Sequence, residues 1–156
     1  MTKEIINPKK IGIAADHAGF ELKTYLVKIL NKYGYEVIDF GNNVLNPADD
    51  YPDYVIPLAR AIAAQEIMRG ISVCGSGVGA CIAANKIAGV RACLIHEKFS
   101  AKQGVEDDNM NMICLGGRVV NPSLAKELIL VFLNATFSGF ERHVRRLAKV
   151  SQLEKQ

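Results

Sequence analysis

Residues 71–80 read ISVCGSGVGA, and this stretch decides the predicted fold. The apolar run at its start is typical of a buried strand, and the segment CIAANK at 81–86 is typical of a helix. Gly75, Gly77 and Gly79 allow the backbone to approach a ligand closely, while a helix start adds partial positive charge. We therefore expect a strand, a turn with free backbone N–H groups and a helix, with a site for an anionic or phosphorylated substrate at the turn.

Cys74 stands where the predicted strand ends. A helix start favours the ionised form of a nearby thiol, so Cys74 is a candidate thiolate near neutral pH. The alternative is a small buried hydrophobic residue before an ordinary tight turn. The G-x-G-x-G spacing is neither a dinucleotide fingerprint nor a P-loop, so a nucleotide is not the first expectation. A cysteine-phosphatase loop is also disfavoured, because its C-x5-R pattern needs an arginine where Ala80 stands.

Apolar runs alternate with helical periodicity along the rest of the chain. The expected strands are residues 11–15, 36–40, 70–73, 91–95 and 112–115. The expected helices, besides the one after the glycine turn, are residues 20–33, 54–65, 99–105, 123–133 and 140–153. This alternation predicts one α/β domain over residues 1–156. We expect a doubly wound, five-stranded parallel sheet in a three-layer α/β/α arrangement, flavodoxin- or Rossmann-like, with an extra C-terminal helix.

In the flavodoxin-like strand order, the first and third strands are neighbours, and ligands bind at their carboxyl ends. Asp16 and His17 follow the first strand and would then face Cys74 across one crevice. His17 is a candidate phosphate ligand, although it could also be a surface histidine, and Asp16 could cap the following helix. Tyr51 lies on a turn-rich loop that could fold over this crevice or pack only within itself.

Composition restricts the class of protein. The 156 residues are 49% hydrophobic and 22% charged, as in an ordinary globular protein, and the net charge of +3 is too small to indicate a nucleic-acid partner. The longest apolar runs fall well short of the roughly 20 residues of a membrane span. The N-terminal MTKEIINPKK has no apolar signal core, so we expect a cytoplasmic location.

The four cysteines show no C-x-x-C pair and no histidines at metal-ligand spacing, so the sequence predicts neither a disulfide nor a metal site. Basic residues gather near the end of the chain. They are Arg142, His143, Arg145, Arg146 and Lys149. This cluster indicates an anion or an acidic partner surface, or else a solvated helix face.

Several short segments together resemble the ribose-5-phosphate isomerase B family, which includes the galactose-6-phosphate isomerase subunits. The segments are ADHAGFELK at 15–23, DYP at 50–52, CGSGVG at 74–79, IAANK at 82–86, GVRA at 89–92, LGGRV at 115–119 and RHxxR at 142–146. They occur in the family's order and cover the whole chain after its first nine residues.

The resemblance implies a metal-independent aldose–ketose isomerase without a cofactor, interconverting ribose 5-phosphate and ribulose 5-phosphate in the pentose phosphate pathway. It also implies a homodimer or a dimer of dimers with sites at the subunit interface. Cys74 would be the base that moves a proton between C1 and C2, with Ser76 assisting proton transfer at the sugar oxygen. The enediolate would be held by the backbone N–H groups of Gly75, Gly77, Val78 and Gly79.

The family's remaining ligands carry over to other positions of this chain. The phosphate would be bound by His17, Arg142, Arg146 and, entering from the partner subunit, Arg118. Asp16 and Tyr51 would contact the sugar. Elementary chemistry agrees with this assignment, since moving a carbon-bound proton requires a base and donors for the resulting oxyanion. Arginine suits a phosphate dianion because its planar fork can bind it through two hydrogen bonds.

One segment departs from the family. Many members have a histidine, thought to open the sugar ring, where this chain has Asp107, and an asparagine where it has Asp108. Asp107 could take the proton of the anomeric hydroxyl, His96 could do so instead, or the substrate could be an open-chain or a different sugar. Asp108 could contact the sugar.

The departure keeps other functions open. The first alternatives are galactose 6-phosphate and allose 6-phosphate isomerisation. A non-catalytic phosphosugar-binding module is a further alternative, disfavoured because Cys74 is present.

Overall fold

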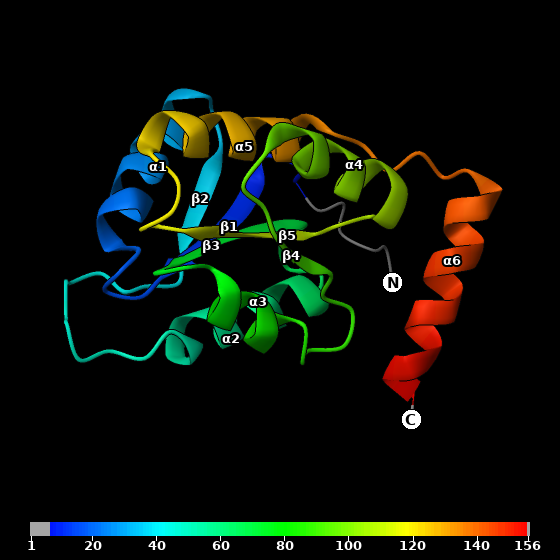
Figure 1. Ribbon diagram of the computed structural model, residues 1–156, viewed down its shortest axis with the longest axis horizontal. Helices are drawn as coiled ribbons and strands as arrows, with labels where there is room; N and C mark the ends of the chain where they lie inside the picture. Colours follow the sequence, from blue (N-terminus) through cyan, green and yellow to red (C-terminus); the bar gives the residue numbers. More distant parts are fainter. Residues whose placement is uncertain (1–6, 156) are drawn as a thin grey trace.

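A computed structural model describes residues 7–155 and shows a three-layer α/β/α fold (Figure 1). The strands are β1 (Lys10–Ala15), β2 (Glu36–Asp39), β3 (Arg69–Cys74), β4 (Ala92–Leu94) and β5 (Met112–Gly116). The helices are α1 (Phe20–Lys32), α2 (Pro52–Ala63), α3 (Val78–Ala84), α4 (Lys98–Asp108), α5 (Pro122–Asn134), α6 (Glu141–Ser151) and the 3-10 turn η1 (Gln152–Lys155). All strand pairs are parallel, in the order β2-β1-β3-β5-β4. The predicted fold class is confirmed.

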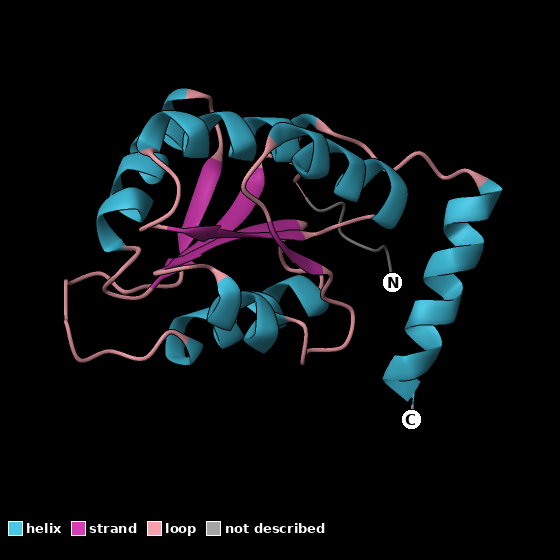
Figure 2. Cartoon of the chain, in the orientation of Figure 1, coloured by secondary structure: helices cyan, strands magenta, loops and turns pink. Residues whose placement is uncertain are grey.

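Figure 2 shows the sheet between two groups of helices, with α1, α4 and α5 on one face and α2 and α3 on the other. Along each central strand, successive side chains point to opposite faces of the sheet, so each strand contributes to the core on both faces. Ile13, Ile71 and Ile113 are register partners on β1, β3 and β5 and lie in the core beneath α1, α4 and α5. Met112 and Cys114 face the opposite core, beneath α2 and α3. Burial on both faces explains why these strands read as continuous apolar runs.

Element boundaries differ from the sequence-based expectation by a few residues. The second helix was expected at residues 54–65, but α2 begins at Pro52, whose fixed φ suits the first helical turn. The fourth helix begins at Lys98 because the Glu97 side chain accepts hydrogen bonds from the backbone N–H groups of Phe99 and Ser100. This helix continues to Asp108, three residues beyond its expected end.

The C-terminal helix α6 stands beside the three layers and contacts α4 (Figure 1). His143 is its one buried residue, while Val144 and Val150 remain exposed. No helix within residues 7–155 combines the length and the apolar character needed to span a bilayer.

A buried cation connects the first helix to the loop that follows β2. The Lys23 side chain is 3% exposed, and its Nζ donates to both Asp39 carboxylate oxygens at 2.8 Å and to the Asn42 carbonyl oxygen. Lys23 therefore holds α1, the end of β2 and the start of the 41–51 loop together. Its long aliphatic stem packs inside while its charge is fully paired.

Lys23→Met should lower the free energy of unfolding by about 2 kcal/mol, because it leaves Asp39 and the Asn42 carbonyl without their partner. The matched control is Lys28→Met on the exposed side of the same helix, which should change it by less than about 0.5 kcal/mol. Urea unfolding of both variants measures the difference. Equal effects would contradict a specific role for the buried ammonium.

Candidate active site

The carboxyl ends of the three central strands form one edge of the sheet. Ala15 of β1 pairs with Val73 of β3, and Cys74 pairs with Gly116 of β5. The loops that follow these strands surround a cavity of about 370 Å³. Its lining residues are Asp16, Tyr51, Cys74, Gly75, Ser76, Gly79, Arg118 and Val119. The structure thus brings seven of the predicted site residues together around Cys74.

The glycine turn shapes the surroundings of the Cys74 thiol. Gly77 has a φ of 81°, a conformation that side chains disfavour, and α3 begins immediately after it. Its N–H donates to Cys74 Sγ at 3.1 Å, and the Val78 N–H donates to Ser76 Oγ at 3.3 Å. These two predicted ligand-binding N–H groups are therefore engaged within the turn. A donor aimed at sulfur suits a thiolate.

Tyr51 and Arg118 form opposite walls of the cavity. A Cβ added at Gly79 would lie 2.7 Å from the Tyr51 ring, so the tyrosine packs directly on the start of α3. The Arg118 N–H donates to the Gly75 carbonyl at 3.0 Å, and its guanidinium lies beside Gly75. The expectation that Arg118 enters from a partner subunit is corrected: β5 carries it to the cavity of its own chain.

Asp16 both lines the cavity and holds the turn that follows β1. It lines the cavity, and its carboxylate accepts hydrogen bonds from the N–H groups of Ala18 and Gly19 at 3.0 and 3.2 Å. The helix-capping alternative for Asp16 is wrong, because Gly19 is the N-cap of α1 and no side chain caps it; Asp16 closes the turn that precedes the helix. Gly19 is required here, because a Cβ at this position would lie 2.2 Å from the Val73 carbonyl oxygen.

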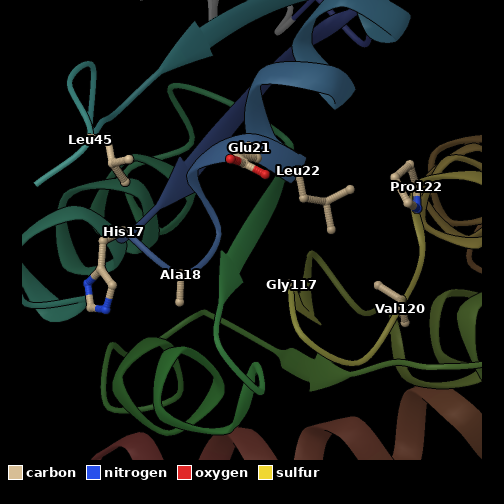
Figure 3. Close-up of a pocket in the computed structure, with 8 residues that line it drawn as sticks. All are labelled: His17, Ala18, Glu21, Leu22, Leu45, Gly117, Val120 and Pro122. Carbon is tan, nitrogen blue, oxygen red and sulfur yellow. The ribbon is translucent and has the colours of Figure 1, made fainter. Parts of the chain in front are cut away.

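His17 lines a neighbouring cavity of about 440 Å³ (Figure 3). In this view His17 and Leu45 lie on one side, and Val120 and Pro122 lie on the other. The His17 N–H and its ring Nδ1 both approach Asp49 Oδ1, at 2.9 and 2.7 Å. Sequence reasoning missed Asp49, because it lies 32 residues from His17 in an irregular loop and no motif or periodicity singles it out.

The Asp49 side chain is 3% exposed. Burial raises the pKa of this carboxyl, but hydrogen bonds from the His17 backbone and ring, the nearby imidazole charge and a hydrogen bond from Asn42 outweigh it. The pKa of Asp49 therefore lies below its ordinary value. Burial and the same carboxylate raise the pKa of the Tyr54 phenol.

One cluster beside the cavity contains side chains of the types that bind metals. Within residues 7–155, one group of His, Cys, Asp and Glu side chains has ligand atoms close enough to share an ion: Asp16, His17 and Asp49, within 4.8 Å of one another. The short contact between His17 Nδ1 and Asp49 Oδ1 is a hydrogen bond, which leaves this nitrogen protonated and unable to bind a metal. These residues are better suited to orienting His17 than to holding an ion.

Four predicted site residues lie elsewhere, where α4 meets α6. They are Asp107, Asp108, Arg142 and Arg146, and none belongs to the lining of the Cys74 cavity. Asp107 accepts from Gln103 Nε2 at 2.8 Å and lies 3.3 Å from the buried His143 Nδ1. Arg142 Nε donates to His143 Nε2 at 2.8 Å. Within one chain, the structure does not bring these residues to Cys74.

Two further groups lie near the strand ends: His96, which the sequence offered as an alternative ring-opening group, and Cys81, which it did not single out as a site residue. His96 follows β4, and its Nε2 is buried without a hydrogen-bond partner among the described residues. A hydrogen bond with the Cys114 thiol lowers the pKa of Cys81 to about 7, against the opposing effect of burial. Cys81, on α3, is therefore a second ionisable thiol behind the glycine turn.

Comparison with known proteins agrees with this geometry. Residues 11–150 match the family described as Ribose/Galactose Isomerase. Ribose-5-phosphate isomerase B from Escherichia coli is 40% identical over 146 residues, which cover 94% of this chain and 97% of that protein. D-erythrulose-4-phosphate isomerase from Pectobacterium atrosepticum is 40% identical over 129 residues, covering 83% and 85%.

Solved structures extend the match to the whole fold. Ribose-5-phosphate isomerase B of Clostridium thermocellum superposes with a TM-score of 0.90 at 42% identity, covering 94% of this chain and 97% of that one. The Mycoplasma genitalium enzyme with bound ribulose 5-phosphate gives 0.89 at 38% identity, with the same coverage. The chain therefore belongs to the ribose/galactose isomerase family and is a sugar-phosphate isomerase of the ribose-5-phosphate isomerase B type.

Proposed function

We propose that this protein interconverts ribose 5-phosphate and ribulose 5-phosphate with Cys74 as the base. The observation that carries the proposal is the Cys74 thiol with its N–H donor, in a cavity shared with Asp16, Ser76 and Arg118. The relative from Mycoplasma genitalium binds ribulose 5-phosphate, which supports a pentose phosphate as substrate. An isomerase assay of the purified protein against ribose 5-phosphate, allose 6-phosphate and galactose 6-phosphate tests this directly.

The proposed reaction is a proton transfer that needs no metal or cofactor. The Cys74 thiolate removes the C2 proton of the open-chain aldose, which leaves a cis-enediolate. The resulting thiol then returns the proton to C1, while Ser76 assists proton movement between the two sugar oxygens. The backbone N–H groups of Gly75 and Gly79 stabilise the negative oxygen. Asp16 and Tyr51 orient the sugar.

The phosphate site is proposed to be completed by a second copy of the chain. His17 and Arg118 would bind the phosphate from one subunit, and Arg142 and Arg146 would reach it from α6 of the partner. Arg142 and Arg146 are four residues apart, so they project from one face of that helix. Exposed apolar side chains near the cavity and on the C-terminal helical segment support an interface between two copies. They are Val78, Ile82, Leu94 and Val119 near the cavity, and Val144, Val150 and Leu153 on α6 and η1. A dimer or a dimer of dimers would satisfy this arrangement.

Asp107 is proposed to open the sugar ring from the partner's α4. Its carboxylate is 32% exposed, which leaves it accessible beyond its contacts with Gln103 and His143. His96 is the second candidate, because its buried Nε2 lacks a hydrogen-bond partner within residues 7–155.

A four-carbon sugar phosphate is the second candidate substrate. The relative from Pectobacterium atrosepticum acts on D-erythrulose 4-phosphate. A tetrose 4-phosphate cannot form a furanose ring, because the phosphate occupies its terminal oxygen, so it would need no ring-opening histidine. This substrate is compatible with aspartate at position 107 and belongs in the same assay.

Cys74→Ala should lower kcat by at least about 100-fold while leaving the affinity for ribose 5-phosphate within about twofold, because the phosphate ligands are other groups. Cys93→Ala, a half-buried cysteine outside the cavity lining, is the control and should retain activity. Steady-state kinetics and calorimetry measure the two effects. More than a tenth of the wild-type kcat in Cys74→Ala would exclude this base, and retained binding with no wild-type activity would favour the binding-module alternative.

Subunit mixing tests the shared site. Inactive Cys74→Ala subunits exchanged with Arg142→Ala subunits should regain about a quarter of wild-type activity, because half of the dimers then contain one intact site of two. Cys74→Ala mixed with Arg118→Ala should regain none, since both residues are proposed to serve the same chain's site. The opposite pattern would show that Arg118, rather than Arg142, crosses the interface.

Asp107→Asn should lower kcat/KM for ribose 5-phosphate by about 100-fold but change kcat/KM for erythrose 4-phosphate by less than about threefold, because only the pentose must be ring-opened. Glu106→Gln, which removes the adjacent carboxylate of α4, should affect neither substrate. Parallel losses on both sugars would instead show that Asp107 acts by holding His143 and Arg142.

A further inference from the structure

Asp49 is a buried carboxylate beneath an otherwise exposed loop. Residues 43–48 are all exposed, yet the Asp49 side chain is 3% exposed. It accepts hydrogen bonds from the His17 backbone N–H, from His17 Nδ1 and from the Asn42 side-chain amide. An aspartate this deeply buried is uncommon unless its charge is paired, and here the pairing is with a residue of the candidate site.

The contact determines which His17 nitrogen carries a proton. An ionised carboxylate can only accept hydrogen bonds, so the 2.7 Å approach of Asp49 Oδ1 requires a proton on Nδ1. The depressed pKa of Asp49 keeps it ionised above the acid range. Nε2 is then the ring nitrogen left for a ligand. The imidazole is 31% exposed and lines the crevice cavity (Figure 3), so a ligand can reach it.

The same carboxylate determines the placement of the ring in two further ways. Because it binds both the backbone N–H and the side chain of His17, it restricts rotation of the imidazole about its first side-chain bonds. The bond from Asn42 fixes the carboxylate itself, and the Asn42 carbonyl is held in turn by Lys23. A chain of hydrogen bonds therefore runs from Lys23 through Asn42 and Asp49 to the imidazole.

We propose that Asp49 is a positioning residue for phosphate recognition: it accepts the Nδ1 proton of His17 and so holds the imidazole with Nε2 left for the ligand, where Nε2 donates to a substrate phosphate when the ring is doubly protonated. This inference rests on the proposed function, since it takes His17 as a phosphate ligand. Only the doubly protonated ring can donate to an anion from Nε2, and the Asp49 carboxylate lies 2.7 Å from Nδ1, where it pairs with the charge of that form.

A double-mutant cycle separates this role from simple support of the loop. Asp49→Asn keeps the size and loses the charge, and it should raise KM for ribose 5-phosphate and the inhibition constant of inorganic phosphate about tenfold, with kcat within about twofold. His17→Ala should produce a loss at least as large. In the His17→Ala background, Asp49→Asn should add less than about twofold, because its effect passes through the imidazole. Asp53→Asn, an exposed carboxylate four residues later, is the control and should change neither constant.

A structural role would give a different result. If Asp49 only staples the loop, Asp49→Asn raises KM equally in both backgrounds and lowers kcat through Tyr51, and the proposal is overturned. It is also overturned if His17→Ala leaves phosphate inhibition unchanged.

Nitrogen NMR of the imidazole tests the geometry without turnover, so it holds even if ribose 5-phosphate is not the substrate. The chain has three histidines, and His17→Gln identifies the His17 signals. In the wild type the neutral ring should carry its proton on Nδ1, and in Asp49→Asn the proton should no longer be confined there. A neutral wild-type ring that carries its proton on Nε2 instead of Nδ1 would contradict the proposal. An inactive protein with the expected NMR pattern would refute the substrate and leave the Asp49–His17 pairing intact.

Discussion

Parallel pairing of β1, β3 and β5 is the constraint on which the candidate site depends. Because Ala15 lies beside Val73, and Cys74 beside Gly116, three loops leave the sheet at one edge. Asp16, Cys74 and Arg118 come from these separate loops and are otherwise far apart in the sequence. The close approach is possible because Gly19 crosses the end of β3 without a side chain. A shift of one of these strands by one residue would exchange the side chains that it contributes to the two cores and would separate these groups.

Buried charge organises the loop between β2 and α2. Lys23 pairs with Asp39 and the Asn42 carbonyl, and Asp49 pairs with His17 and the Asn42 side chain. Removing one partner from such a set is costly, because the remaining charge stays buried. The loop therefore has a defined path although most of its residues are exposed. Tyr51, at its end, consequently reaches the start of α3 and closes the cavity.

The chain divides its candidate ligands between two regions. Cys74 and its neighbours lie at the strand ends, whereas Asp107, Arg142 and Arg146 lie where α4 meets α6. His143 is the buried link of the second region and contacts both Asp107 and Arg142. This division explains why α6 packs so little against its own chain, if its role is to complete a neighbouring subunit. Through His143, the carboxylate at position 107 is also connected to the Arg142 guanidinium.

Local sequence determined the layered α/β fold and most of the Cys74 cavity, because apolar periodicity and glycine turns act over a few residues and the switch-point rule then brings strand ends together. Cys74, Asp16 and Tyr51 were predicted on that basis, whereas Ser76 followed from the family resemblance, which the comparisons confirmed. Tertiary structure alone decided the rest. The partner of His17 is 32 residues away in an irregular loop, the chain to which Arg118 contributes depends on the path of β5, and the burial of His143 depends on how α6 meets α4. Such contacts follow from long-range packing and charge pairing, which leave no periodic trace in the sequence.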